Sequence, residues 1–265
     1  MTTFEAVIIA IVEGITEFLP ISSTGHMIVT SSLLGIHDDD FTKLFEICIQ
    51  LGAILAVVAL YWKKFFVFDR NRFRFYVKLL LATLPALLCG YLFHSKIKAM
   101  MGHPGIVVAT MLLGGIVLLF ADNWFKKPEI TSDEQVDHFR AIRIGFFQCI
   151  SLIPGVSRSA ATIIGGMQQK LTRSAAAEFS FFLAVPTMFA ATCYDLLKDH
   201  EALTAQAGNL QLLVTGFIIA FVVAVIAIKF FIGLLKKYGF RVWGIYRIIA
   251  GIILLILIYN GYIHG

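Results

Sequence analysis

The sequence predicts an all-α integral membrane protein, and three observations support this. Of the 265 residues, 58% are hydrophobic and 15% are charged, whereas soluble domains carry about 25% charged residues. Six apolar stretches are long enough to cross a bilayer. Two more apolar regions are interrupted by a proline and a cluster of hydroxyl residues. We therefore expect a polytopic fold of six transmembrane helices plus two re-entrant broken-helix hairpins, with an inverted-topology repeat.

The predicted spans follow from the length of a membrane-crossing helix, about 17–25 residues. They cover approximately 45–62, 76–94, 106–124, 178–195, 210–235 and 242–262. The interrupted regions 3–35 and 142–170 each look like two half-helices. Irregular backbone at that depth is tolerated where it contacts protein or a wet cavity, so we expect hairpins. The alternative for 3–35, two full spans, would reverse the orientation of the N-terminus.

Basic residues predict the orientation. Sixteen of the 22 Lys and Arg fall in connections on one side: Lys63, Lys64, Arg70, Arg72, Arg74, Lys78, Lys126, Lys127, Arg140, Arg143, Lys170, Arg173, Lys236, Lys237, Arg241 and Arg247. The opposite connections, at 37–40, 95–105 and 195–201, are acidic or sparse in charge. By the positive-inside rule the basic side is cytoplasmic. Six crossings then put both termini outside, and the two hairpins enter from opposite faces.

We expect a single membrane domain, 1–265, made of two repeats. We expect repeat one at about 1–125, repeat two at about 140–265 and a cytoplasmic linker at 126–140. The segment TKLFEICIQLGAILAV parallels RSAAAEFSFFLAVPTM, which places Glu46 opposite Glu178. Inverted repeats with broken helices place their site near the membrane midplane, where the two halves meet.

The first broken region, EGITEFLPISSTGHMI, carries unusual polarity for an apolar segment. Glu13 and Glu17 are four residues apart and share one helix face. Pro20 then ends the helix. Possible caps and a titratable group follow: Ser22, Ser23, Thr24 and His26. Because His26 lies in the first turn of the next helix, it could reach Ser23 or a bound phosphate.

The second broken region, QCISLIPGVSRSAATII, repeats this design. Pro154 precedes Ser157, Arg158 and Ser159 at the start of the next helix. Two helix N-termini at one place would attract an anion, and arginine is the preferred bidentate partner of phosphate. Arg158 is the only arginine that we place within the apolar layer, where such residues are usually functional. A structural alternative pairs it with Glu46 or Glu178.

The two carboxylates of the first region need a partner. Glu13 and Glu17 repel each other on a buried face unless a cation or proton lies between them. Beside a phosphate, Mg²⁺ or Ca²⁺ would satisfy both. The alternatives are a protonated glutamate acting as general acid and an ion pair with Arg158. The four cysteines have no metal-like spacing, and we expect them to be core residues.

The strings VEGITEFLPISSTGH and PGVSRSAAT strongly resemble the bacterial undecaprenyl-diphosphatase family. Glu13 and Glu17 match its E-x-x-x-E motif, residues 22–26 match S-S-T-G-H, and residues 154–162 match P-G-x-S-R-S-x-x-T. The likeness covers essentially the whole chain. It implies removal of the terminal phosphate from undecaprenyl diphosphate, which recycles the lipid carrier of peptidoglycan synthesis and confers bacitracin resistance. It also implies a divalent cation and a plasma-membrane site open to the outer, periplasmic face.

The resemblance implies a role for each matching residue. Glu13 and Glu17 would bind the metal, Ser23 would be the nucleophile and His26 the acid or base. Arg158 and Ser157 would clamp the diphosphate, and the further phosphate-binding residues would be Ser22, Thr24, Ser159 and Thr162. Whether serine or water attacks stays open. A second class of lipid phosphatase uses a histidine after its S-R pair, but that position is Ile164 here.

Two other functions compete with hydrolysis. A secondary transporter or flippase of a phosphorylated lipid would share the inverted repeat. It would not need a nucleophile, an acid or base and an arginine in one place. A structural subunit would leave the intramembrane charges unexplained. We expect a polyprenyl diphosphate and membrane lipids as partners, no nucleic acid, and leave a homodimer open.

Overall fold

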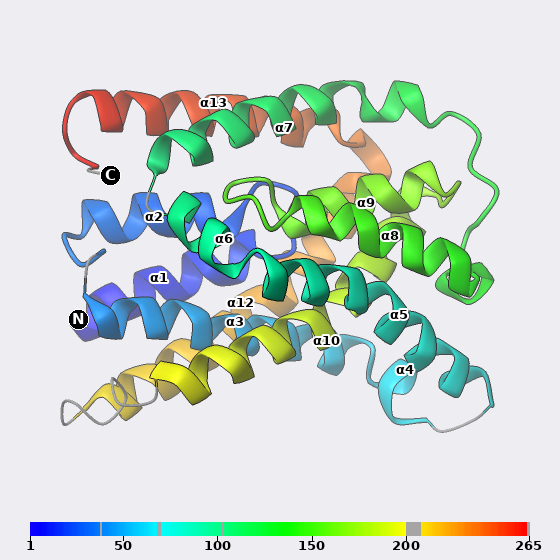
Figure 1. The fold of residues 1–265 in the computed structure, drawn as a ribbon, viewed down its shortest axis with the longest axis horizontal. Coiled ribbons are helices and arrows are strands. Elements are labelled where there is room, and N and C mark those ends of the chain that lie inside the picture. The colour runs from blue at the N-terminus through cyan, green and yellow to red at the C-terminus, as the bar shows by residue number, and fades with distance from the viewer. Residues whose placement is uncertain (38, 68–69, 102, 200–207, 264–265) are drawn as a thin grey trace.

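The computed structural model describes residues 1–265 except 38, 68–69, 102, 200–207 and 264–265. Long helices lie side by side along one axis of the molecule (Figure 1). The helices are α1 (Thr3–Thr16), α2 (Ser23–Leu33), α3 (Asp40–Leu60), α4 (Trp62–Phe66), α5 (Arg70–Leu92), α6 (His94–Met101), α7 (Pro104–Trp124), α8 (His138–Ile150), α9 (Arg158–Gln168), α10 (Arg173–Asp199), α12 (Asn209–Tyr238) and α13 (Arg241–Tyr259), with a 3₁₀ turn, η1 (Asp133–Gln135).

The six predicted spans are confirmed. Within the described residues, six helices are long and apolar enough to cross a membrane: Asp40–Leu60, Arg72–Leu92, Pro104–Trp124, Arg173–Tyr194, Asn209–Tyr238 and Arg241–Tyr259. The sequence did not predict the short helices α4 and α6, which extend two of these spans at their ends. The chain is therefore an all-α, multi-pass membrane protein.

The two interrupted regions form helical hairpins. Helices α1 and α2 have 14 and 11 residues, and α8 and α9 have 13 and 11. At about 1.5 Å per residue each is shorter than the roughly 30 Å hydrocarbon layer, so region 3–35 does not form two full spans. In Figure 1 the α1–α2 hairpin opens at the end where the N-terminus lies, and the α8–α9 hairpin opens at the opposite end.

Each hairpin packs closely on one spanning helix through a glycine. A methyl group added at Gly14 of α1 would lie 2.8 Å from the carbonyl oxygen of Ala220 in α12. One added at Gly145 of α8 would lie 2.3 Å from the carbonyl oxygen of Ala82 in α5. The two hairpins are therefore anchored in similar ways. The repeat limits, 1–125 and 140–265, stay a prediction.

The basic connections gather at one end of the bundle, as predicted. Asp122 at the end of α7 accepts hydrogen bonds from Arg173 Nε at 2.6 Å and from the backbone nitrogen of Phe240 at 2.8 Å. Lys64 Nζ lies 2.6 Å from Asp133 Oδ1. These bonds tie the connections after α3, α7, α9 and α12 together. Of the opposite connections, residues 38, 102 and 200–201 lie outside the described part of the chain.

One of the basic residues does not lie where we predicted. Arg247 is fully buried within α13 rather than in the connection before it, so Arg158 is not the only arginine in the apolar layer. The predicted span 242–262 already included position 247, so counting this arginine with the connection was the error. Gly239, at φ +67°, lets the chain reverse at once, and α13 begins at Arg241. Arg247 consequently lies about 9 Å inside the helix, at about 1.5 Å per residue.

Candidate functional site

The site lies where the tips of the two hairpins meet inside the bundle. Ser159 Oγ, in the first turn of α9, donates to the carbonyl oxygen of Leu19 at 2.7 Å. Arg158 Nη2 lies 2.9 Å from Glu17 Oε1. Both contacts join the turn after α1 to the start of α9. The predicted meeting of the two polar regions is therefore present in the structure.

Serine residues cap the second helix of each hairpin, α2 and α9, as the sequence predicted. Ser22 Oγ accepts from Gly25 N at 3.3 Å and caps α2. Ser157 Oγ accepts from Ala160 N at 3.3 Å and caps α9. Both caps have positive φ, +70° for Ser22 and +71° for Ser157, a conformation that residues other than glycine seldom adopt. Such backbone persists only where its surroundings fix it.

Arg158 bridges the two halves of the site. Besides Glu17, it donates through Nη1 to the carbonyl oxygen of Ser180 in α10 at 2.9 Å. The hydroxyl of Ser180 lies 2.6 Å from Thr162 Oγ1 in α9. The arginine thus pairs with Glu17 and not with Glu46 or Glu178. Its counter-charge comes from the hairpin opposite.

Glu17 also receives the hydroxyl of Ser23. Ser23 Oγ donates to Glu17 Oε2 at 2.7 Å, so one carboxylate holds both the arginine and the serine. Glu17 is 6% exposed, which makes both interactions stronger than they would be in water. A carboxylate in this position can accept the proton of the serine.

His26, in the first turn of α2, contacts the backbone of its own helix start and Tyr246 of α13. Its Nδ1 lies 2.7 Å from the carbonyl oxygen of Ser22, and its Nε2 lies 2.8 Å from the hydroxyl of Tyr246 in α13. The two rings are stacked, with centroids 5.6 Å apart. Because a carbonyl only accepts, Nδ1 carries a proton, and in the neutral ring Nε2 then accepts from the Tyr246 hydroxyl. The structure therefore joins Ser23 to Glu17, and His26 to Tyr246. Thr24 lies half-buried in the same turn.

Two buried groups of the site have no hydrogen-bond partner. Both carboxylate oxygens of Glu13 are in this state, and so is Nε of Arg158. Glu13 is 0% exposed and interacts electrostatically with Glu17 and Arg158. Buried polar atoms are normally paired. A cation would satisfy Glu13, and a phosphate oxygen would satisfy the arginine. Among the described residues there is no cluster of three or more His, Cys, Asp and Glu side chains for a metal.

Comparisons with known proteins show the family of this chain. The sequence model of the bacitracin resistance protein BacA matches residues 6–253. The chain belongs to the BacA family. It is 55% identical to an undecaprenyl-diphosphatase of Flavobacterium psychrophilum, over 97% of this chain and 96% of the relative. It is 48% identical to one of Bdellovibrio bacteriovorus, over 99% and 98%, and 47% identical to one of Aquifex aeolicus, over 96% and 97%.

Three residues near the site of this BacA family member were not predicted to belong to it: Ser180, Tyr246 and Arg247. A polar residue within an apolar run was the available sign for each, as in EFSFF and GIYRII. Such signs do not say which face of a helix points inward. Only the packing of α10 and α13 against the hairpins does.

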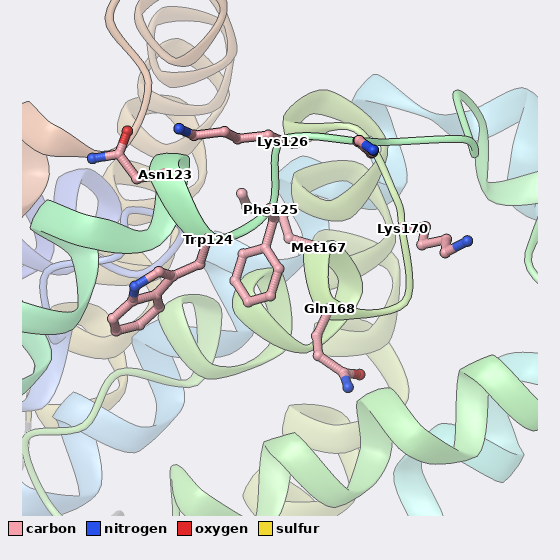
Figure 2. Close-up of a pocket in the computed structure, with 8 residues that line it drawn as sticks. Asn123, Trp124, Phe125, Lys126, Met167, Gln168 and Lys170 are labelled. Carbon is pink, nitrogen blue, oxygen red and sulfur yellow. The ribbon is translucent and has the colours of Figure 1, made fainter.

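Two surface cavities lie away from these residues. One, of about 330 Å³, lies between the end of α7 and the end of α9 and is lined by Trp124, Phe125 and Met167, among others (Figure 2). Another, of about 570 Å³, is lined by residues 72–78 and 133–138. Both are at the basic end. Neither contains a residue of the hairpin tips.

Proposed function

We propose that this protein hydrolyses undecaprenyl diphosphate to undecaprenyl phosphate and inorganic phosphate. The reaction recycles the lipid carrier for peptidoglycan synthesis and confers resistance to bacitracin. Family membership and the names of the relatives support it. The single observation that carries the mechanism is that Glu17 binds both Ser23 and Arg158. A base, a nucleophile and a phosphate-binding cation lie together in one buried place.

The chemical step begins at Ser23. Its oxygen attacks the terminal phosphorus, and Glu17 takes the hydroxyl proton over the 2.7 Å hydrogen bond. The bond from phosphorus to the bridging oxygen breaks, and undecaprenyl phosphate leaves. Water then attacks the phosphoserine. Glu17 returns its proton to the serine oxygen, accepts the proton that the water loses, and releases it to solvent.

Charge stabilisation is the main contribution of the other residues, since phosphoryl transfer depends chiefly on positioning and electrostatics. The unpaired Nε of Arg158 would donate to a phosphate oxygen. The N-termini of α2 and α9, with their serine caps, add backbone donors and positive dipole ends. Ser22, Thr24, Ser157 and Ser159 lie at these N-terminal caps and first turns, and Thr162 lies in the second turn of α9. The His26–Tyr246 pair orients the turn that carries Ser23.

A divalent cation, Mg²⁺ or Ca²⁺, is part of the proposal. The unpaired oxygens of Glu13 support it, and Glu17 would be the second protein ligand. Two carboxylates suffice because Mg²⁺ usually keeps several waters and takes its other ligands from substrate phosphates. When bound, the ion would neutralise carboxylate and phosphate charge and polarise the transferred phosphoryl group.

We place the protein in the bacterial plasma membrane, with its site open to the outer, periplasmic face. The aromatic packing supports this orientation. Phe18 and Phe181, which directly follow Glu17 and Ser180 in the chain, meet edge to face, with ring centroids 5.3 Å apart. Phe182 packs on Phe65 and Phe75 further toward the basic end. In the proposed orientation this core would close the cytoplasmic side. A homodimer is a further prediction, which cross-linking in native membranes tests.

Phosphate release from a prenyl diphosphate by the detergent-purified protein tests the function. We expect release with Mg²⁺ or Ca²⁺, none with EDTA, and a loss on the order of 100-fold or more for Glu17→Gln, which removes the base. Glu5→Gln, on the same helix, is the matched control, because glutamine also serves in a capping box. Absence of release from folded wild type with metal supplied would reject hydrolysis and favour a lipid-phosphate transporter, for which flux across liposomes is the assay.

A further inference from the structure

The side chain of Arg247 is buried inside the helix bundle and has no role in the proposed chemical steps. It is 0% exposed. Its five N–H groups donate to five carbonyl oxygens: Met111 O at 3.3 Å from Nε, Pro20 O at 3.2 Å and Val156 O at 3.0 Å from Nη1, and Thr110 O at 3.0 Å and Gly155 O at 2.9 Å from Nη2. A guanidinium has five donors. All are used, so none is left for a substrate.

The carbonyls belong to the segments that form the site. Pro20 lies in the turn of the first hairpin, three residues before Ser23. Gly155 and Val156 immediately precede the cap of α9 and Arg158. The remaining two carbonyls belong to α7. One buried guanidinium thus holds both hairpin turns against each other and against the α7–α13 pair.

Small residues make room for this arrangement. A methyl group added at Gly114 of α7 would lie 2.5 Å from Arg247 Nη2. One added at Gly155, where φ is +87°, would lie 2.1 Å from Thr110 Oγ1. Burying a guanidinium among carbonyls carries a large desolvation cost. An apolar side chain would fill the same space without that cost, so packing alone does not account for the arginine.

We propose that Arg247 is a positioning residue of the diphosphatase. It fixes the two hairpin tips relative to each other, so that Glu17 and Ser23 from one hairpin and Arg158 from the other act on the same phosphate. This inference rests on the proposed function. Arg158, with one unpaired donor, binds the substrate. Arg247, whose donors are all paired with backbone carbonyls, fixes the positions of the two hairpin turns.

Steady-state kinetics with a prenyl diphosphate form the first test. Arg247→Met keeps an unbranched aliphatic stem but loses the guanidinium and all five donors, and we expect kcat to fall about 100-fold, as for misplacement of reacting groups by about 1 Å. KM should change less than about threefold, because substrate contacts are retained. Arg247→Lys should recover part of the loss. Arg241→Met, at the exposed start of α13, is the control and should resemble wild type.

A second test does not depend on activity. Spin labels at Leu33 and Gln168, exposed residues near the far ends of α2 and α9, report the spacing of the hairpins by pulsed dipolar spectroscopy. We expect a narrow distance distribution in wild type and Arg241→Met, a broadened or shifted one in Arg247→Met, and an intermediate one in Arg247→Lys. If Arg247→Met does not fold, Gly114→Ala displaces the guanidinium instead, and the same changes are expected.

The outcomes separate the two proposals. An inactive wild type rejects the diphosphatase, while the label distances still test positioning. A folded Arg247→Met with an unchanged distance distribution, or with kcat within about threefold of wild type, overturns the role of Arg247. A merely structural role would lower the folded fraction but leave the distances and the turnover per folded molecule unchanged.

Discussion

Arg158 and Glu17 form an ion pair of 2.9 Å that joins the start of α9 to the end of α1. The two side chains are 12% and 5% exposed, so neither charge is well solvated. Each hairpin therefore supplies the counter-charge of the other. In the proposed mechanism the substrate phosphate shares this pair, because Arg158, its proposed partner, already contacts Glu17, the proposed base.

Substitution of Arg158 should affect both activity and stability. Arg158→Ala leaves Glu17 buried and unpaired, which costs about 3–5 kcal/mol in comparable pairs, and should abolish most phosphate release. Arg158→Lys keeps the charge but cannot reach Glu17, Ser180 and a phosphate at once, so we expect at least about a 10-fold loss of kcat/KM. Near-normal turnover of folded Arg158→Ala would contradict the phosphate clamp. Arg143→Lys on α8 is the control.

Ser23→Ala should lower kcat by about 10³-fold or more, because it removes the attacking oxygen and leaves only charge stabilisation. The wild type, quenched in acid during turnover with a substrate labelled on its terminal phosphate, should carry label on Ser23. Ser32→Ala, at the other end of α2, should retain both activity and label. Substantial turnover of Ser23→Ala would show that water attacks directly.

Glu13→Gln should raise the Mg²⁺ concentration needed for half-maximal phosphate release. Loss of an outer-shell partner alone typically weakens a metal site about 10–100-fold, so loss of a direct ligand should weaken it at least as much. The melting temperature should not fall, because the substitution removes the charge of a buried carboxylate that accepts no hydrogen bond and lies beside a second carboxylate, Glu17. Glu5→Gln is again the control. An unchanged Mg²⁺ dependence would contradict the metal role of Glu13.

Tyr246→Phe removes the hydroxyl that lies 2.8 Å from His26 Nε2 and keeps the stacked ring. We expect a loss of kcat of about 2- to 10-fold, which corresponds to one neutral hydrogen bond of about 0.5–1.5 kcal/mol. The loss should be smaller than for His26→Ala. Tyr259→Phe, which is 90% exposed in the wild type, should have no effect. Equal activity of Tyr246→Phe and wild type would show that this hydrogen bond does not contribute to the reaction.

Asp137 caps α8 at the membrane surface, where its Oδ1 accepts from Arg140 N at 2.8 Å. This hydrogen bond is the main cause that lowers the pKa of Asp137. A lowered pKa means that the stabilisation is present above the unfolded pKa, about 3.9, and is lost as pH falls through the folded pKa. Asp137→Ala should therefore destabilise by about 1 kcal/mol at pH 7 and by less near pH 3.

Melting curves in detergent at both pH values measure this difference. Asp137→Asn keeps a capping side chain that does not titrate, so it should stay close to wild type at pH 7. A constant difference between Asp137→Ala and wild type at both pH values would contradict the cap.

The sequence by itself determined the spans, the two interruptions and the residues gathered there. Apolar length sets how many helices cross a membrane, and proline with serine sets where a helix ends and the next begins. These rules act over a few residues, so Pro20, Ser22, Pro154 and Ser157 could be interpreted without a structure.

Tertiary structure decided which side chains pair. Glu17 takes Ser23 and Arg158, His26 turns to Tyr246, and Arg247 lies inside the bundle rather than in a basic loop. Glu17 and Ser23 are six residues apart, whereas the other contacts join segments far apart in the chain. Such pairs depend on which helix faces meet at the hairpin tips, and the order of residues along the chain does not specify that.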